Sequence, residues 1–242
     1  MPVFRSSPLI SQLEDNIFSV LEKMAAQTDA SQRPVIDLSS GSPRQPTPPE
    51  VVAALQLAAA RPDNHDYPSF WGKAELRQAI ARYCEASYGY CPDPESEIAI
   101  FQGAHIGVSG IPRAILSPGE YLISTDPCYP IYRSAAAQAQ ARFYGIPLQA
   151  ERQFLPDFSQ VPSEVRQHAG LLMLNYPHNP TGAIATEQLF DEALDFVRQQ
   201  NIPLLHDFAY ASVGSQPHPA PLSLMSRPEG AEWGVEIYTM SK

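Results

Sequence analysis

The sequence is short of cysteine, of basic residues and of long apolar runs, and each shortage excludes a class of protein. The three cysteines, Cys84, Cys91 and Cys128, form no C-x-x-C pair, which argues against a disulfide-held secreted scaffold and fits a reducing compartment. The 16 basic residues against 26 acidic ones, a net charge of −10, argue against nucleic acid or an anionic membrane as a partner. No apolar run reaches the length of a membrane span, and residues 1–18 lack the apolar core of a signal peptide. We therefore expect a cytoplasmic protein.

Proline, in contrast, is abundant. The 242 residues include 25 prolines, which stand singly or in pairs between apolar segments and so indicate a fold with many loops. Hydrophobic residues make up 44% of the chain and charged residues 17%, an ordinary globular composition. The length is sufficient for one large domain, or one and a half small ones, with a substantial buried core.

The pattern of apolar residues predicts an α/β fold. Apolar residues recur with helical period over 9–27, from Pro48 and Pro49 to about Ala60, and over 73–87, and VIDLSSGSPRQPTPPE suggests a short strand followed by a loop. From residue 98 onward, short strands alternate with helices, which predicts a mostly parallel sheet covered on both faces. The expected strands are 98–101, 121–124, 142–146, 171–175, 202–206 and 235–239, and the expected helices among them lie within 103–116, 129–141 and 186–200.

Candidate functional residues follow these strands directly. Ligands of such sheets bind outside the carboxyl ends of the strands. A glycine-rich turn at 103–107 could offer helix N–H groups to an anion, and an aromatic residue in 126–132 could stack on a flat ring. In 175–182 the Asn179 amide could meet a ligand oxygen, and in 206–210 Asp207 could face a cationic heterocycle with the Tyr210 hydroxyl nearby. Taken singly, each cluster also has a structural reading as a turn, a cap or a surface group.

The order of these clusters carries more information than any one of them. Together with GSPRQPTPPEV, YPSFWGKAELRQAI, LNYPHNPTG and HDFAY, it resembles the fold-type-I, class I and II pyridoxal-phosphate-dependent aminotransferases from about residue 35 to the end. The branch with LL-diaminopimelate aminotransferase is the most similar. The resemblance implies a large domain at 35–242 with a sheet of the seven-stranded type between helices, and a segment 1–34 belonging to a small domain. Family members continue beyond the lysine that matches Lys242, so we expect a truncated chain or one half of a split pair.

The resemblance also implies a role for each candidate residue. Lys242 would form the Schiff base with pyridoxal phosphate and later move a proton, and Asp207 would pair with the ring nitrogen. Asn179 and Tyr210 would bind the ring 3′-oxygen, and Tyr129 would stack on the ring. The remaining expected contacts are Ala104, His105, Thr239 and Ser241 at the phosphate, Tyr67 at a phosphate across a homodimer interface, and Gly41 with Asn179 near the substrate.

Two positions depart from the family pattern. His105 stands where similar proteins often have lysine, which lowers the attraction for phosphate. Asn16 stands near the position of a substrate-contacting tyrosine, which weakens the case for diaminopimelate as substrate.

The favoured function is amino transfer between an amino acid and a 2-oxo acid, with no metal. Alternatives are a β-lyase or synthase on the same fold, and a non-catalytic remnant or a half enzyme that a C-terminal chain completes. A nicotinamide-dependent dehydrogenase suits the alternating elements but would require a G-x-G-x-x-G motif after the first strand.

Overall fold

The computed structural model describes residues 5, 7–13, 15–28, 31, 33–39, 41, 45–213 and 220–241. The chain divides into two compact units. The larger unit comprises Met1–Ser39 and Phe101–Lys242, and the smaller unit comprises Ser40–Ile100.

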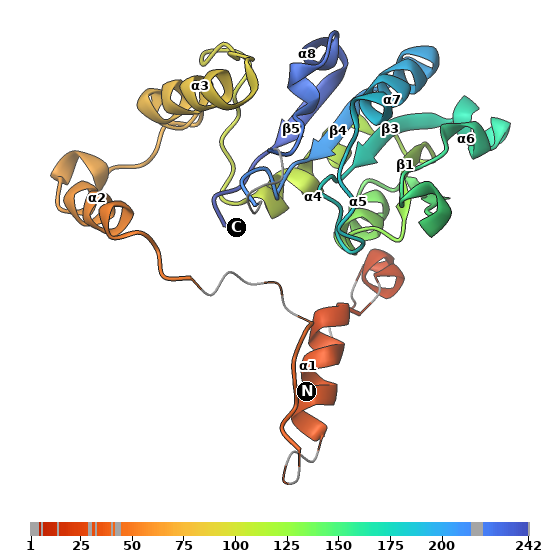
Figure 1. Ribbon diagram of the computed structural model, residues 1–242, viewed down its shortest axis with the longest axis horizontal. Coiled ribbons are helices and arrows are strands. Elements are labelled where there is room, and N and C mark those ends of the chain that lie inside the picture. The colour runs from red at the N-terminus through yellow and green to blue at the C-terminus, as the bar shows by residue number, and fades with distance from the viewer. Residues whose placement is uncertain are drawn as a thin grey trace. The chain divides into compact units, whose positions relative to one another are not determined.

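The larger unit is built on a sheet of five parallel strands (Figure 1). The strand order is β2-β1-β3-β4-β5, so the chain reverses its direction of travel across the sheet between β1 and β3. This point is where parallel α/β sheets open a crevice for ligands. The parallel α/β fold is confirmed, and the described residues supply five strands of the seven-stranded type of sheet. The strands are β1 (Tyr121–Asp126), β2 (Arg142–Pro147), β3 (Ala169–Leu174), β4 (Leu204–Asp207) and β5 (Gly234–Ile237).

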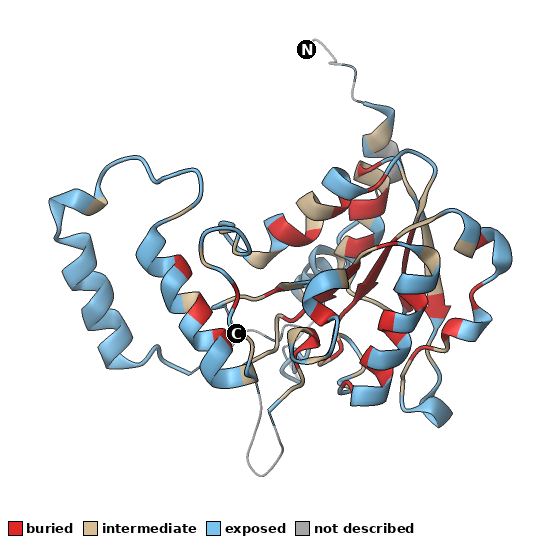
Figure 2. Ribbon diagram, turned by 90° about the horizontal axis from the view of Figure 1, so that it is seen from above, coloured by how far each residue is buried: buried red, intermediate tan, exposed pale blue. Residues whose placement is uncertain are grey.

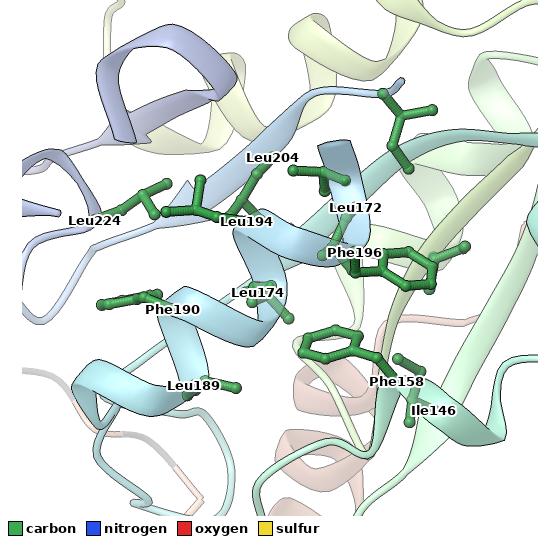
Figure 3. Close-up of a cluster of buried hydrophobic side chains, with 14 of the residues drawn as sticks. Ile146, Phe158, Leu172, Leu174, Leu189, Phe190, Leu194, Phe196, Leu204 and Leu224 are labelled. Carbon is green, nitrogen blue, oxygen red and sulfur yellow. The ribbon is translucent and has the colours of Figure 1, made fainter. Parts of the chain in front are cut away.

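Alternate residues of the strands form two separate cores, as the two-residue period of a strand requires. Leu171 and Met173 of β3 face the helices α4 (Ala104–Ile115) and α5 (Ile131–Gln138). Leu172 and Leu174 face the opposite side, which is covered by α7 (Glu187–Gln200), by α6 (Ser163–Gln167) and by the short helix η4 (Phe158–Gln160). Figure 3 shows this second core, and Figure 2 shows buried residues on the strands and on the inner sides of the helices.

Helix α7 illustrates how the sequence determines an element. The Thr186 side chain accepts a hydrogen bond from the N–H of Leu189 at 3.1 Å, which caps the helix, and Asn201 ends it in the left-handed conformation. Six residues of the apolar face are buried: Leu189, Phe190, Ala193, Leu194, Phe196 and Val197. Phe196 stacks on Phe158 of η4, with ring centroids 5.3 Å apart. The helix therefore combines good capping with a continuous apolar stripe.

The smaller unit contains α2 (Pro49–Ala59), η2 (Pro62–Asn64) and α3 (Ala74–Tyr88), which confirms the two helices expected there. The remaining elements of the larger unit are η1 (Pro8–Gln12), α1 (Ile17–Gln27), η3 (Ala150–Arg152), η5 (Leu224–Ser226) and α8 (Gly230–Trp233). Among the described residues, no helix is both long enough and apolar enough to cross a membrane.

Three predicted elements were wrong. Residues 98–101 are not a strand; the Ile100 side chain packs closely against the backbone at Gly72 instead. The short strand expected in VIDLSSGSPRQPTPPE is not found over the described residues 35–39 either, where the Asp37 carboxylate accepts hydrogen bonds from the backbone and hydroxyl of Ser39 and turns the chain. The helix expected over 9–27 is two helices, since the Asn16 side chain caps a new start at α1.

Candidate functional site

Because the sheet is parallel, the segments that follow β1, β3, β4 and β5 emerge along one edge of it. The predicted clusters 126–132, 175–182 and 206–210 follow β1, β3 and β4, Thr239 and Ser241 follow β5, and the cluster 103–107 opens helix α4. The pairing of β3 with β4 runs up to Leu174 and His206, so residues 175 and 207 lie next to each other at this edge.

Asp207 is the buried acid of this edge. It is the last residue of β4 and only 5% of its surface is exposed. Its Oδ2 accepts a 2.7 Å hydrogen bond from the hydroxyl of Tyr132, a buried residue in the first turn of α5. Burial raises the pKa of Tyr132 well above its ordinary value, and the neighbouring Asp207 charge raises this pKa further. The hydroxyl therefore keeps its proton. Sequence reasoning assigned Tyr132 no role, because a pairing between α5 and β4 has no local signature.

Asn179 and Tyr210 meet beside this acid. The Asn179 side-chain amide donates a 3.2 Å hydrogen bond to the Tyr210 hydroxyl, and both residues are half-buried. Burial raises the pKa of Tyr210; the hydrogen bond from Asn179 offsets part of this increase, and the charge of Asp207 adds a smaller one. The pKa of Tyr129 is likewise raised by burial first, then by Asp207 and Tyr210. The Tyr129 ring also meets the Tyr132 ring edge to face at 5.9 Å, so these side chains form one group.

The loop that carries Asn179 is held by a buried histidine. His178 is 4% exposed, and its Nδ1 accepts from the Thr181 hydroxyl at 2.7 Å, while its Nε2 lies 3.1 Å from the hydroxyl oxygen of Thr125 in β1. The backbone N–H of Thr181 also donates to Nδ1, so the ring proton belongs on Nε2. Burial lowers the pKa of His178 to about 4, which makes the ring neutral near pH 7.

Helix α4 begins at the predicted anion loop. Gly103 precedes it with φ of 102°, a conformation that favours glycine, and Ala104 and His105 form the first turn. Ala104 is partly buried against the same apolar cluster as Tyr129, so this helix start belongs to the same neighbourhood. His105 is exposed. The first N–H groups of a helix carry a partial positive charge that suits an anion.

The other predicted residues are less closely connected. Thr239 and Ser241 follow β5, and their hydroxyl oxygens lie 2.5 Å apart. Gly41 and Tyr67 belong to the smaller unit, where both are exposed. Lys242 lies outside the described residues.

The residues that the structure brings together have the chemistry of a site for a flat, nitrogen-containing ring that bears a phosphate. A buried carboxylate suits a protonated ring nitrogen, an amide and a phenol suit a ring oxygen, and a glycine-opened helix start suits the phosphate. Pyridoxal phosphate has each of these groups.

Comparison with known proteins identifies the family. Residues 33–242 match the family described as aminotransferase class I and II. The chain belongs to this family. Its members use pyridoxal phosphate, so the cofactor that the sequence implied is the cofactor of the family.

Two curated relatives and one solved structure illustrate the similarity. The chain is 38% identical over 239 residues to L-glutamine--4-(methylsulfanyl)-2-oxobutanoate aminotransferase of Bacillus subtilis, covering 99% of this chain and 60% of that protein. It is 33% identical to LL-diaminopimelate aminotransferase of Syntrophobacter fumaroxidans, covering 99% and 61%. Substrate-bound BacF of Bacillus subtilis superposes with a TM-score of 0.91 at 33% identity, covering 99% of this chain and 60% of that one. The chain thus spans about three-fifths of the length of these relatives.

Proposed function

We propose that the protein transfers an amino group between an amino acid and a 2-oxo acid with pyridoxal phosphate bound through Lys242. The observation that carries the proposal is the buried Asp207 carboxylate, with the hydrogen-bonded pair Asn179 and Tyr210 beside it at the carboxyl edge of the sheet. Family membership supports the same reading.

In this proposal the cofactor, when bound, supplies the electron sink for the reaction, and the protein supplies orientation and charge. Asp207 would keep a proton on the ring nitrogen, because a nearby negative charge favours the protonated form. Asn179 and Tyr210 would hydrogen-bond the ring oxygen, and Tyr129 would stack on the ring. Ala104 and His105 at the start of α4 would bind the phosphate, together with the hydroxyls of Thr239 and Ser241.

Lys242 carries the proton chemistry in this proposal. Its amine would hold the cofactor and would become free when an amino-acid substrate binds. The released amine must then be neutral to accept the proton from the substrate α-carbon, which a site closed to water favours. Next to that carbon, the amine would supply the proximity that makes the transfer fast. Gly41 and Asn179 both stay predicted contacts of the substrate.

Covalent trapping tests the proposal directly. The chain has three lysines, Lys23, Lys73 and Lys242, and the first two are exposed. Borohydride reduction in the presence of pyridoxal phosphate, followed by peptide mass analysis, should place the cofactor on Lys242 and on neither of the others. The matched variants are Lys242→Ala, which should lose the label, and Lys73→Ala, which should keep it. A folded protein labelled equally at all three lysines would contradict the proposal.

Product analysis then separates the reaction types. An aminotransferase converts an added 2-oxo acid into the corresponding amino acid and consumes the donor in equal amount. A β-lyase releases ammonia and pyruvate without an amino acceptor. Wild-type turnover that requires the acceptor, and that Lys242→Ala abolishes, is the expected result.

We further propose that the protein is a cytoplasmic homodimer in which Tyr67 reaches the phosphate of the partner. The smaller unit exposes apolar side chains on α2 and in the loop that follows it, an arrangement typical of interaction surfaces. These residues are Val51, Val52, Leu55, Leu57, Tyr67, Phe70 and Trp71. Sedimentation of wild type and of Leu55→Glu tests this: the wild type should be dimeric, and the variant should dimerise more weakly.

The division at residue 34 into a small-domain segment and a large domain also stays a proposal, as does a complementing C-terminal chain.

A further inference from the structure

Asn175 connects two of the proposed cofactor-binding residues through its side chain. It is the first residue after β3 and is 2% exposed. Its Nδ2 donates a 2.7 Å hydrogen bond to the backbone carbonyl of Asp207, and its Oδ1 accepts a 2.8 Å hydrogen bond from the backbone N–H of Asn179. One buried amide thus binds the end of β4 and the loop after β3 at the same time.

The hydrogen bond from Asn175 to Asp207 continues the pairing of β3 with β4 by one residue. The ladder between β3 and β4 ends at Leu174 and His206, and the Asn175 side chain then takes the place of a further strand residue. On the opposite side, the N–H of Phe208 donates to the carbonyl of Ile237 at 3.0 Å. The peptide group between Asp207 and Phe208 is therefore held from both neighbouring strands, which limits the rotation of the Asp207 backbone.

The bond to Asn179 has a similar effect on the loop. The Asn179 side chain points to the Tyr210 hydroxyl, as its 3.2 Å hydrogen bond requires. The Asn175 side chain is hydrogen-bonded to the backbone of Asn179 and to the backbone of Asp207. This single side chain therefore sets the distance between Asp207, the proposed partner of the ring nitrogen, and Asn179, a proposed partner of the ring oxygen.

We propose that Asn175 is a positioning residue that fixes Asp207 and Asn179 relative to each other; its link to the cofactor rests on the proposed function. An amide is suited to this task because it carries a donor and an acceptor on one short, planar group. The isosteric Asn175→Asp keeps the acceptor for Asn179 but sets a carboxylate against the carbonyl of Asp207. Asn175→Ala removes both bonds. The two variants therefore distinguish the effect of the bond to Asp207 from the effect of the bond to Asn179.

Two measurements on the 242-residue chain test the inference. Amide hydrogen exchange in the absence of cofactor should show the Asn179 N–H exchanging about tenfold faster or more in Asn175→Ala, and nearly unchanged in Asn175→Asp, relative to amides of β1. Equilibrium dialysis should show both variants binding pyridoxal phosphate about tenfold more weakly or worse.

Val197→Ala is the control for a general loss of stability. Val197 is fully buried near the end of α7 that leads toward β4, and the variant should lose stability without either local effect. The inference is overturned if Asn175→Ala keeps both the Asn179 protection and the cofactor affinity of Val197→Ala. If wild type itself takes no label on Lys242, the proposed function fails, and the exchange measurement alone decides the positioning role.

Discussion

The hydroxyl of Tyr132 in α5 donates a 2.7 Å hydrogen bond to the carboxylate of Asp207 at the end of β4, and both side chains are buried. Tyr132→Phe removes this donor and leaves the carboxylate less stabilised. We expect a loss of about 1–3 kcal/mol in the free energy of unfolding, the range for removing one partner from a buried polar pair. Urea denaturation followed by circular dichroism measures it.

A double-mutant cycle isolates the contact. Asp207→Asn removes the charge that the hydroxyl contacts, so Tyr132→Phe should cost less in the Asp207→Asn variant than in wild type. Equal costs in the two backgrounds would mean that the Tyr132 hydroxyl does not stabilise the fold through the Asp207 charge.

Glu236 and His206 form a buried hydrogen-bonded pair between β5 and β4. The Glu236 side chain is 1% exposed and that of His206 is fully buried, with 2.8 Å between Oε1 and Nδ1. His206 Nε2 lies 2.9 Å from the Tyr176 carbonyl, so both ring nitrogens lie within hydrogen-bond distance of an oxygen. Burial alone would raise the pKa of Glu236, but the bonds from His206, Ser223 and Tyr238 lower it below its ordinary value.

Glu236→Gln should be strongly destabilising, because it removes a buried charge and sets an amide NH2 group where the carboxylate accepts hydrogen bonds from Ser223 and Tyr238. We expect a loss of about 3–5 kcal/mol in the free energy of unfolding. Glu164→Gln, which removes an exposed partner 3.7 Å from Arg142, should cost less than about 1 kcal/mol. Similar values for the two variants in urea denaturation would argue against a stabilising role for the buried Glu236 carboxylate.

Sequence reasoning succeeded where a pattern is repeated over several residues. Strand β3 was predicted because a continuous apolar run suits a strand buried on both faces, and α7 because its apolar residues recur with helical period. The positions of Asn179, Asp207 and Tyr210 at one edge of the sheet followed from the rule that parallel strands end together.

Sequence reasoning failed where a single long-range contact determines the local structure. Residues 98–101 have the composition of a strand, but the packing of Ile100 on Gly72 is a contact that the local sequence does not encode. The same holds for Tyr132 and Asn175, whose partners lie 75 and 32 residues away. Long-range hydrogen bonds of this kind have no periodicity to reveal them, so the supporting residues of the site were found only in the structure.

Arg77 stabilises the loop 67–72 of the smaller unit, which contains Tyr67, Phe70 and Trp71. Its buried guanidinium donates to the carbonyls of Gly72 and Pro94 at 2.7 and 2.6 Å and pairs with Glu95 at 3.2 Å. Arg77→Lys keeps the charge but loses the planar fork, so it should destabilise the smaller unit nearly as much as Arg77→Ala, by about 2–4 kcal/mol. Hydrogen exchange across 67–72 measures the effect.

The matched control for this loop is Glu95→Gln, because Glu95 is 67% exposed and its ion pair contributes little. We expect protection of 67–72 to remain close to wild type in this variant. If Glu95→Gln and Arg77→Ala loosened the loop equally, the ion pair and not the carbonyl contacts would be the main stabilising feature.

His178 should make the stability of the larger unit sensitive to mild acid. Burial lowers the pKa of this ring to about 4 in the folded chain, whereas an unfolded histidine titrates near 6.5. Between these values the unfolded chain binds a proton that the folded chain does not, so stability is complete above pH 6.5 and falls as the pH falls toward 4. His178→Asn removes the titration and should therefore lose less stability than wild type over this interval, by on the order of 2 kcal/mol. The test is urea denaturation of wild type and His178→Asn at several pH values.

The exposed His65→Asn is the control, and its pH profile should follow wild type. A His178→Asn profile parallel to wild type would show that the ring takes up its proton as readily in the folded chain as in the unfolded one.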